Sequence, residues 1–151
     1  MISFSGPTQE VEYLARQIGL LGRQEFAREL MGEFAQSAQE YVQQDEFPNS
    51  HDPYGNRWAP LKRHRPQHIG AGPLVKSGKM QGSVRRYVSF SGFTLKAPVP
   101  YAQFHQNGTR KMVARPFFPK DGQLPRAWAL RFERIADAAI ARLMGRTRRA
   151  A

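Results

Sequence analysis

An alternation of apolar and polar residues from Ser83 to Val99 constrains the fold of this chain most. Apolar side chains recur at every second position on both sides of a Ser91-Gly92 pair, which is typical of a two-residue hairpin turn. The alternating residues are Val84, Val88, Phe90, Phe93, Leu95, Ala97 and Val99, with Arg86 as an exception. This period of two predicts an antiparallel hairpin with one face on a core. Other parts of the chain must therefore cover one face of a small sheet.

Apolar residues with helical spacing lie on both sides of the hairpin. The clearest run lies between residues 26 and 41, and another lies between residues 128 and 143. Their members are Phe26, Leu30, Phe34, Ala38 and Tyr41, and then Trp128, Phe132, Ile135, Ala139 and Leu143. Recurrence every three or four positions predicts helices with one apolar face. Residues 8–21 predict an earlier helix and Leu74–Gln81 a short one. We expect an α+β fold in which the N-terminal helices and the C-terminal helix pack on a small antiparallel sheet.

A length of 151 residues predicts a single domain. We expect a helical part (1–47) after a frayed lead-in, a long loop rich in Pro, Gly and His (48–73), a hairpin and extended segment (74–120), a C-terminal helix (121–145), and a flexible basic tail (146–151). Phe47–Ser50 should end the second helix and Gly145 the last one. Trp58 and Leu61 are the expected anchors of the loop. Part of Lys62–Gly72 is expected to be poorly ordered in the isolated chain.

The segment from Tyr101 to Phe118 combines aromatic residues, a turn and cations. Asn107-Gly108 tolerates positive φ and predicts a tight turn that ends a helix or strand. Arg110-Lys111 then places two cations on a loop, and Pro116 favours an extended backbone before it. We expect a further strand of the sheet around Arg110–Phe118. An ordinary connection that packs its aromatic residues into the core is the alternative interpretation.

Three pieces of sequence, in order, carry a family resemblance. Residues 52–61 read DPYGNRWAPL, residues 74–84 read LVKSGKMQGSV, and residues 101–118 contain YAQFHQNGT followed by ARPFF. Together they resemble the tail-completion family of tailed bacteriophages, also called virion morphogenesis proteins. Ser77 and Met80 are conservative departures from that pattern, and the first piece spaces its Asp and Gly differently. The helices predicted on either side agree with the layout that the resemblance implies.

The net charge of +11 is unevenly distributed. Residues 1–52 hold nine of the twelve acidic residues and three arginines, whereas residues 53–120 hold thirteen Lys or Arg and no acid. Residues 121–151 hold seven arginines and three acids. A basic surface can bind nucleic acid, it can bind an acidic surface on another copy or another protein, or it can be merely solvated. The polarity within one chain favours contact between chains.

The residue pattern predicts neither a catalytic nor a metal site. The chain has no cysteine, and a proline between His64 and His68 disfavours the helix that would align them. Residues 53–120 lack the carboxylates that a two-metal nuclease needs. A nuclease site made by His51, Asn56 and His64 is formally available. We expect no enzyme, no cofactor and no metal. Without a signal peptide or an apolar run of 18 residues, we also expect a soluble chain with no membrane contact.

The resemblance implies a structural phage protein that completes the tail or joins head and tail at the neck. It would be found in the virion, and in the host cytoplasm during assembly, with other neck or tail proteins as neighbours. The charge polarity is consistent with a ring of copies joined by heterologous contacts. The candidate interface residues are Glu25, Glu29, Glu33 and Glu40 on one side, and Arg110, Lys111, Arg115 and Phe117 on the other. A basic nucleic-acid-binding module is the alternative function, and contact with packaged DNA is compatible with both.

Overall fold

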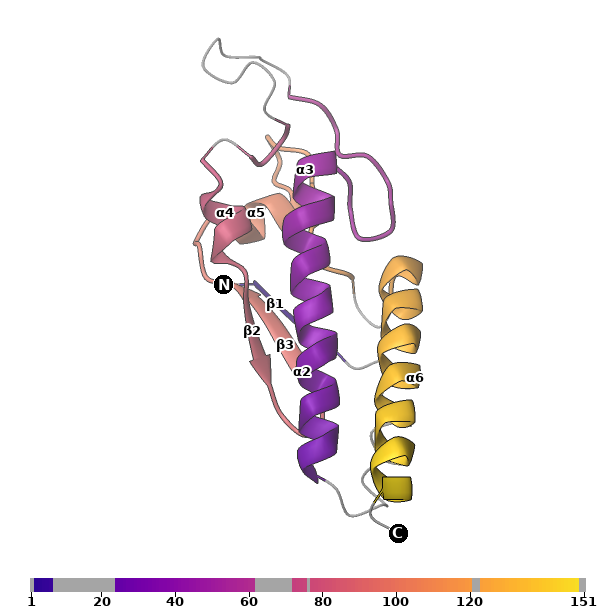
Figure 1. The fold of residues 1–151 in the computed structure, drawn as a ribbon. Coiled ribbons are helices and arrows are strands. Elements are labelled where there is room, and N and C mark those ends of the chain that lie inside the picture. Colours follow the sequence, from indigo (N-terminus) through magenta and orange to yellow (C-terminus); the bar gives the residue numbers. More distant parts are fainter. Residues whose placement is uncertain (1, 7–23, 62–71, 76, 121–122, 150–151) are drawn as a thin grey trace.

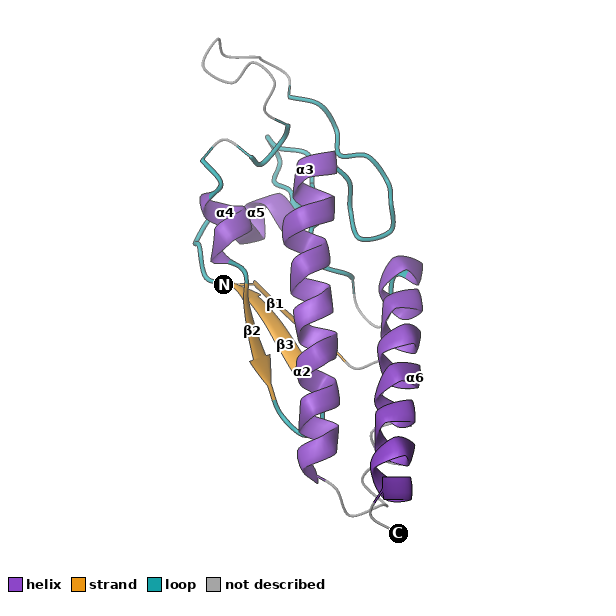
Figure 2. Cartoon of the chain, viewed as in Figure 1, coloured by secondary structure: helices purple, strands orange, loops and turns teal. Residues whose placement is uncertain are grey.

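The computed structural model describes residues 2–6, 24–61, 72–75, 77–120 and 123–149. The elements follow the order β1 (Ile2–Gly6), α2 (Gln24–Tyr41), the π-helix η1 (Val42–Glu46), α3 (Phe47–Asn49), α4 (Lys79–Ser83), β2 (Arg85–Val88), β3 (Phe93–Ala97), α5 (Ala102–Asn107) and α6 (Arg126–Arg149). The α+β class is confirmed, and Figure 2 shows the helices grouped around one small sheet. The predicted helix at 8–21 and the expected disorder in 62–71 lie outside the described residues.

The sheet has three antiparallel strands in the order β1-β3-β2. The predicted hairpin is confirmed, because Val88 pairs with Phe93 and Arg85 with Lys96. Phe93, Leu95 and Ala97 are buried on one face of β3, as the alternation predicted. The third strand was predicted wrongly. It is β1, which pairs Ile2 with Ala97, and not the segment around Arg110–Phe118.

The core lies between the sheet, α2 and α6. α2 contacts β2 and β3 with one side, and α6 runs antiparallel along α2 (Figure 1). Phe132 of α6 stacks on Phe34 of α2, with ring centroids 4.6 Å apart, and meets Phe93 of β3 edge-on at 5.9 Å. The two helical stripes read from the sequence are therefore the two sides of one apolar core.

Two predicted details of these elements differ in the structure. Phe90 continues the alternation in sequence, but it lies on the hairpin turn and is 58% exposed. α6 continues past Gly145 to Arg149, so the predicted helix end is wrong and residues 146–149 are helical. Gly145 is a permitted though unfavourable residue inside a helix, and a single glycine does not end one. By contrast, α2 and its extension end where expected, at Ser50 with φ 57°.

Candidate functional site

The side chains of Trp58 and Arg115 each bind backbone carbonyls in the segment that carries the other residue. The indole N–H of Trp58 donates to the carbonyl of Pro116 at 2.8 Å. In return, the guanidinium of Arg115 donates to the carbonyls of Ala59 and Pro60 at 2.8 and 3.1 Å. Two of the three motif pieces, far apart in sequence, are thus joined by reciprocal hydrogen bonds. Trp58 is buried, which agrees with its predicted role as an anchor of the loop.

Gln106 binds the same segment from the other side. Its side-chain oxygen accepts the backbone N–H groups of Phe117 and Phe118, both at 3.0 Å. Its side-chain nitrogen donates to the carbonyl of Phe118 at 2.8 Å, and the backbone N–H of Arg115 donates to the backbone carbonyl of His105 at 2.7 Å. One amide therefore supplies the hydrogen bonds that a neighbouring strand would supply, which explains why this extended segment needs no strand partner.

Arg115 and Phe117 lie in the interior, which removes both from the predicted interface surface. Phe117 is fully buried, with its ring 5.6 Å from that of Phe47. Arg115 is 7% exposed, and the carbonyls that it binds are the acceptors a buried guanidinium requires. Burial lowers the pKa of His105, and the nearby positive charge of Arg115 lowers it further.

Arg110 and Lys111 lie at the tip of a tight turn, as predicted. The N–H of Thr109 donates to the carbonyl of Met112 at 2.8 Å, and the N–H of Met112 donates back at 3.2 Å. Both cations between them are exposed. Gly108 precedes the turn with φ 74°, and a Cβ at that position would lie 2.9 Å from the backbone nitrogen of Ala114. The glycine of the Asn-Gly pair is therefore required both by its conformation and by the close passage of the chain.

A turn at the start of the 52–61 piece is also fixed by hydrogen bonds. Asp52 accepts the N–H groups of Tyr54 and Asn56 at 2.9 and 2.8 Å, and Gly55 has φ 88°. The hydroxyl of Tyr54 accepts the N–H of Lys120 at 3.0 Å, which ties this turn to the segment before α6.

In the piece at residues 74–84, Gly78 has φ 65° before α4, and the side-chain amides of Gln43 of η1 and Gln81 each donate to the backbone carbonyl of the other residue. Motif residues from all three pieces thus fix the course of the backbone.

The acidic candidates lie along α2. Glu25 and Glu29 are exposed, and neither forms an ion pair with another described residue. Glu33 is bound to Arg142 of α6 at 2.6 Å, so within one chain it already has a cationic partner. Glu40 accepts a hydrogen bond from Gln36 at 2.9 Å. The structure does not bring Glu25 or Glu29 near Arg110, because the start of α2 and the turn after α5 lie at opposite ends of the molecule (Figure 1).

Glu46 is a buried acid that the sequence analysis missed. It is fully buried in η1, and neither carboxylate oxygen has a well-formed hydrogen bond. Burial raises its pKa well above the usual range, Asp52 and Asp45 add to the rise, and the indole of Trp128 acts in the opposite direction. No local pattern marks it, because its surroundings come from α6 and from the turn at residue 52.

The described part of the chain lacks both metal-ligating clusters and membrane-spanning helices. It contains no group of three or more His, Asp or Glu side chains placed to hold a metal ion. His64 and His68 lie outside it. None of the helices that it contains combines the length and the apolar character needed to cross a membrane.

Comparison with known families identifies the chain. A family model, the phage virion morphogenesis family, matches residues 8–145. The chain belongs to this family. The resemblance carried by the three motif pieces is therefore confirmed, and a virion morphogenesis protein has a role in assembling the phage particle. Comparisons with curated proteins and with solved structures gave no match.

Proposed function

We propose that this virion morphogenesis protein completes the tail and joins it to the head, as a ring of identical copies at the neck. Membership of the family over residues 8–145 carries the proposal. The hydrogen bonding of the motif residues supports it, because Trp58, Gln106 and Arg115 hold backbone segments in place. A protein that works by surface fit needs such a rigid frame, and no reacting group is required of it.

The charge distribution supports ring formation. Exposed acids stand at the start of α2 and exposed cations at the turn after α5, so one chain carries both halves of a complementary contact. A contact between different surfaces of identical chains is heterologous, and it closes into a ring when the rotation between neighbours allows. Arg110, Lys111, Glu25 and Glu29 remain the interface candidates, whereas Arg115 and Phe117 act from the interior.

The test is the location and copy number of the protein in intact particles. A tagged chain should be seen by cryo-electron microscopy as a ring between head and tail. Phage that lack the protein should yield filled heads and separate tails. Particles that lack the chain but have heads and tails joined normally would disprove the role.

The outward face of the sheet favours nucleic acid as a second candidate ligand. Arg85 and Tyr87 are exposed there, and the ammonium of Lys96 lies 4.8 Å from the ring centre of Tyr87. Cations beside an aromatic ring are typical of surfaces that bind phosphates and bases. A dedicated binder would hold random duplex below about 1 µM, with affinity falling steeply as salt rises. No measurable binding by the isolated chain at physiological salt would leave only the assembly role.

A further inference from the structure

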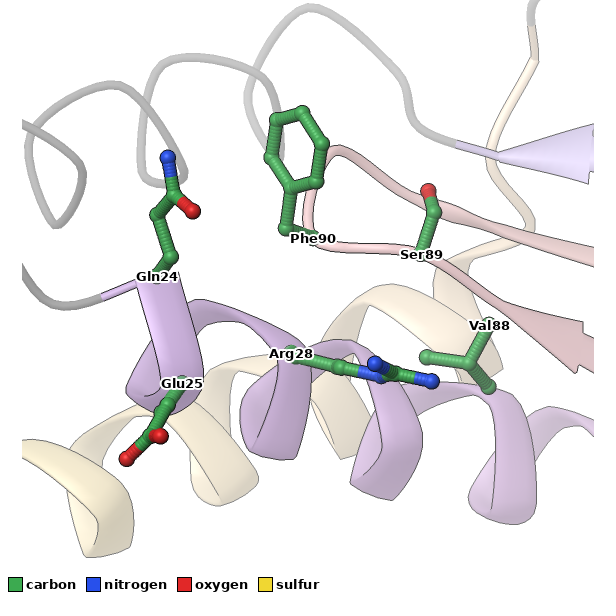
Figure 3. Close-up of a pocket in the computed structure, with 6 residues that line it drawn as sticks. All are labelled: Gln24, Glu25, Arg28, Val88, Ser89 and Phe90. Atoms are coloured by element: carbon green, nitrogen blue, oxygen red, sulfur yellow. The ribbon is translucent and has the colours of Figure 1, made fainter.

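A surface hollow lies between the start of α2 and the turn that joins β2 to β3. It has a volume of about 410 Å³ and is lined by Gln24, Glu25, Arg28, Val88, Ser89 and Phe90. We call these six residues the hairpin hollow. Arg28 extends from α2 toward Val88, whereas Glu25 points to another side of the helix (Figure 3). Phe90 projects from the turn and is 58% exposed, so apolar surface is open to solvent here.

The chemistry of the hairpin hollow favours an aromatic side chain that is flanked by cations. Val88 and Phe90 offer apolar contact, and a cavity of only about 150 Å³ is enough to bind a benzene ring. The guanidinium of Arg28, which extends toward Val88, is available as a cation–π partner for an entering ring. Glu25, which points away from the hollow, and Glu29, four residues further along α2, are exposed carboxylates that cations carried beside that ring can reach from outside the hollow.

A group with these properties lies at the other end of the same chain. Phe104 on α5 is 47% exposed, Val113 is 53% exposed, and Arg110 and Lys111 stand at the tip of the turn between them. We call these four residues the basic knob. The carbonyl of Phe104 accepts the N–H of Gly108 at 2.9 Å, so the aromatic residue and the turn are parts of one fixed unit.

The hairpin hollow and the basic knob cannot meet within one molecule. β3 begins at the hairpin turn, and its other end leads to α5, so the two surfaces lie at opposite ends of the sheet (Figure 1). We infer that the basic knob of one copy docks into the hairpin hollow of the next, with Phe104 entering between Arg28 and Val88. Arg110 and Lys111 then lie against Glu25 and Glu29. The inference rests on the proposed ring and names the surfaces that build it.

Chemical cross-linking tests the contact, because the native chain has no cysteine. Ser89→Cys in the hairpin hollow and Gln103→Cys beside Phe104 are made in separate chains, mixed, and treated with a short bismaleimide. We expect covalent dimers from the mixture, little product from either variant alone, and a ladder from the double variant. Head-to-tail contact gives this pattern, whereas a symmetric dimer would link one variant to itself.

Two matched controls make the result specific. Adding Phe104→Ser should slow cross-linking roughly tenfold, whereas Tyr87→Ser should leave it unchanged, although Tyr87 is also an exposed aromatic residue beside cations. Ser89→Cys mixed with Gln123→Cys should give only background product. Equal rates for the two cysteine pairs, or no effect of Phe104→Ser, would overturn the contact.

The outcomes separate the contact from the proposed function. If the chain is found at the neck of particles but the cross-link is absent, the contact is wrong and the function stands. If the cross-link forms as expected but particles lack the chain, the contact stands and the neck function is wrong. Saturable binding of an acidic or nucleic-acid ligand at the basic knob, without self-association, would also overturn the contact.

Discussion

Gln106 shows how much of this fold depends on one side chain. Its amide holds two backbone N–H groups and one carbonyl of the segment that contains Phe117 and Phe118. These backbone groups are buried together with two phenyl rings, so water cannot replace the amide.

We expect Gln106→Leu to lower the free energy of unfolding by about 2–4 kcal/mol, because buried backbone groups lose their partners. Chemical denaturation followed by tryptophan fluorescence measures the change. Gln103→Leu is the matched control, since Gln103 lies on the same helix and is exposed. An equal fall in the free energy of unfolding of both variants would show that the effect comes from changing the helix and not from losing the Gln106 amide.

Gly108 is constrained by both conformation and space. With φ 74° and the backbone nitrogen of Ala114 2.9 Å from the position of a Cβ, an alanine strains the turn in two ways. We expect Gly108→Ala to destabilise the protein by about 2–4 kcal/mol. Gly82→Ala is the control, because it has open space around it and lies in α4, and it should be neutral or slightly stabilising. Thermal unfolding distinguishes the two.

Glu46 makes stability depend on pH. Its pKa is raised in the folded state, mainly by burial, so the folded protein holds this proton more tightly than the unfolded chain does. The free energy of unfolding should therefore fall as pH rises above the ordinary glutamate pKa of 4.5, until the raised pKa is passed.

Glu46→Gln cannot ionise and should lose this dependence. We expect it to melt at a higher temperature than the native protein at about pH 8, and the difference should shrink toward about pH 5. Glu133→Gln, at an exposed position of α6, controls for the general loss of negative charge. A native protein that gains stability over Glu46→Gln as pH rises would contradict the sign of the shift.

At the scale of elements, α6 is held to the rest of the core mainly by aromatic packing. Phe132 contacts Phe34 of α2 and Phe93 of β3, with ring centroids 4.6 and 5.9 Å away, and it lies beside Trp128 of α6 itself at 6.3 Å. The ion pair between Arg142 and Glu33 is partly exposed, and exposed pairs of this kind contribute little.

We expect Phe132→Ala to reduce the free energy of unfolding by about 3–5 kcal/mol. Leu130→Ala, at a site 45% exposed on the same helix, should change it by less than about 1 kcal/mol. Urea denaturation gives both values. A small effect of Phe132→Ala would mean that α6 is held by something other than this cluster.

Elements built from local patterns could be predicted from the sequence, and elements built from distant partners could not. Alternation located β2 and β3, and helical spacing located α2 and α6. β1 was missed because Ile2 and Phe4 are its only apolar side chains and its partner lies about ninety residues away.

The predicted interface failed in part for the same reason. Arg115 follows exposed cations in sequence, yet its side chain is buried because it binds backbone carbonyls more than fifty residues earlier. Arg110 and Lys111 were placed correctly as exposed loop residues, because the Asn-Gly signal is local.

At the scale of the whole molecule, the separation of charges predicts salt-sensitive self-association. Raising the salt from about 0.05 M to about 0.5 M should weaken association roughly tenfold, because exposed charges are screened over this range. Sedimentation at a series of protein concentrations measures this change in association.

Arg110→Glu should assemble poorly, and adding Glu29→Arg should restore part of the lost association. Arg126→Glu is the control, because Glu29→Arg should not restore any association that this variant loses. Association that is insensitive to salt would mean that the charges do not contribute to the contact and that only its apolar residues do.

The ends of the described chain also lie toward opposite ends of the sheet. Ile2 pairs with Ala97 on the side of α5, and the antiparallel course of α6 brings Arg149 to the side where α2 starts. In a head-to-tail series of subunits, the C-terminal end of α6 in one subunit therefore comes near β1 of the next subunit. A tandem gene with a brief glycine–serine spacer should consequently yield concatenated subunits that dock in sequence. Such concatemers would allow native and altered protomers to be alternated at a fixed ratio around one assembly.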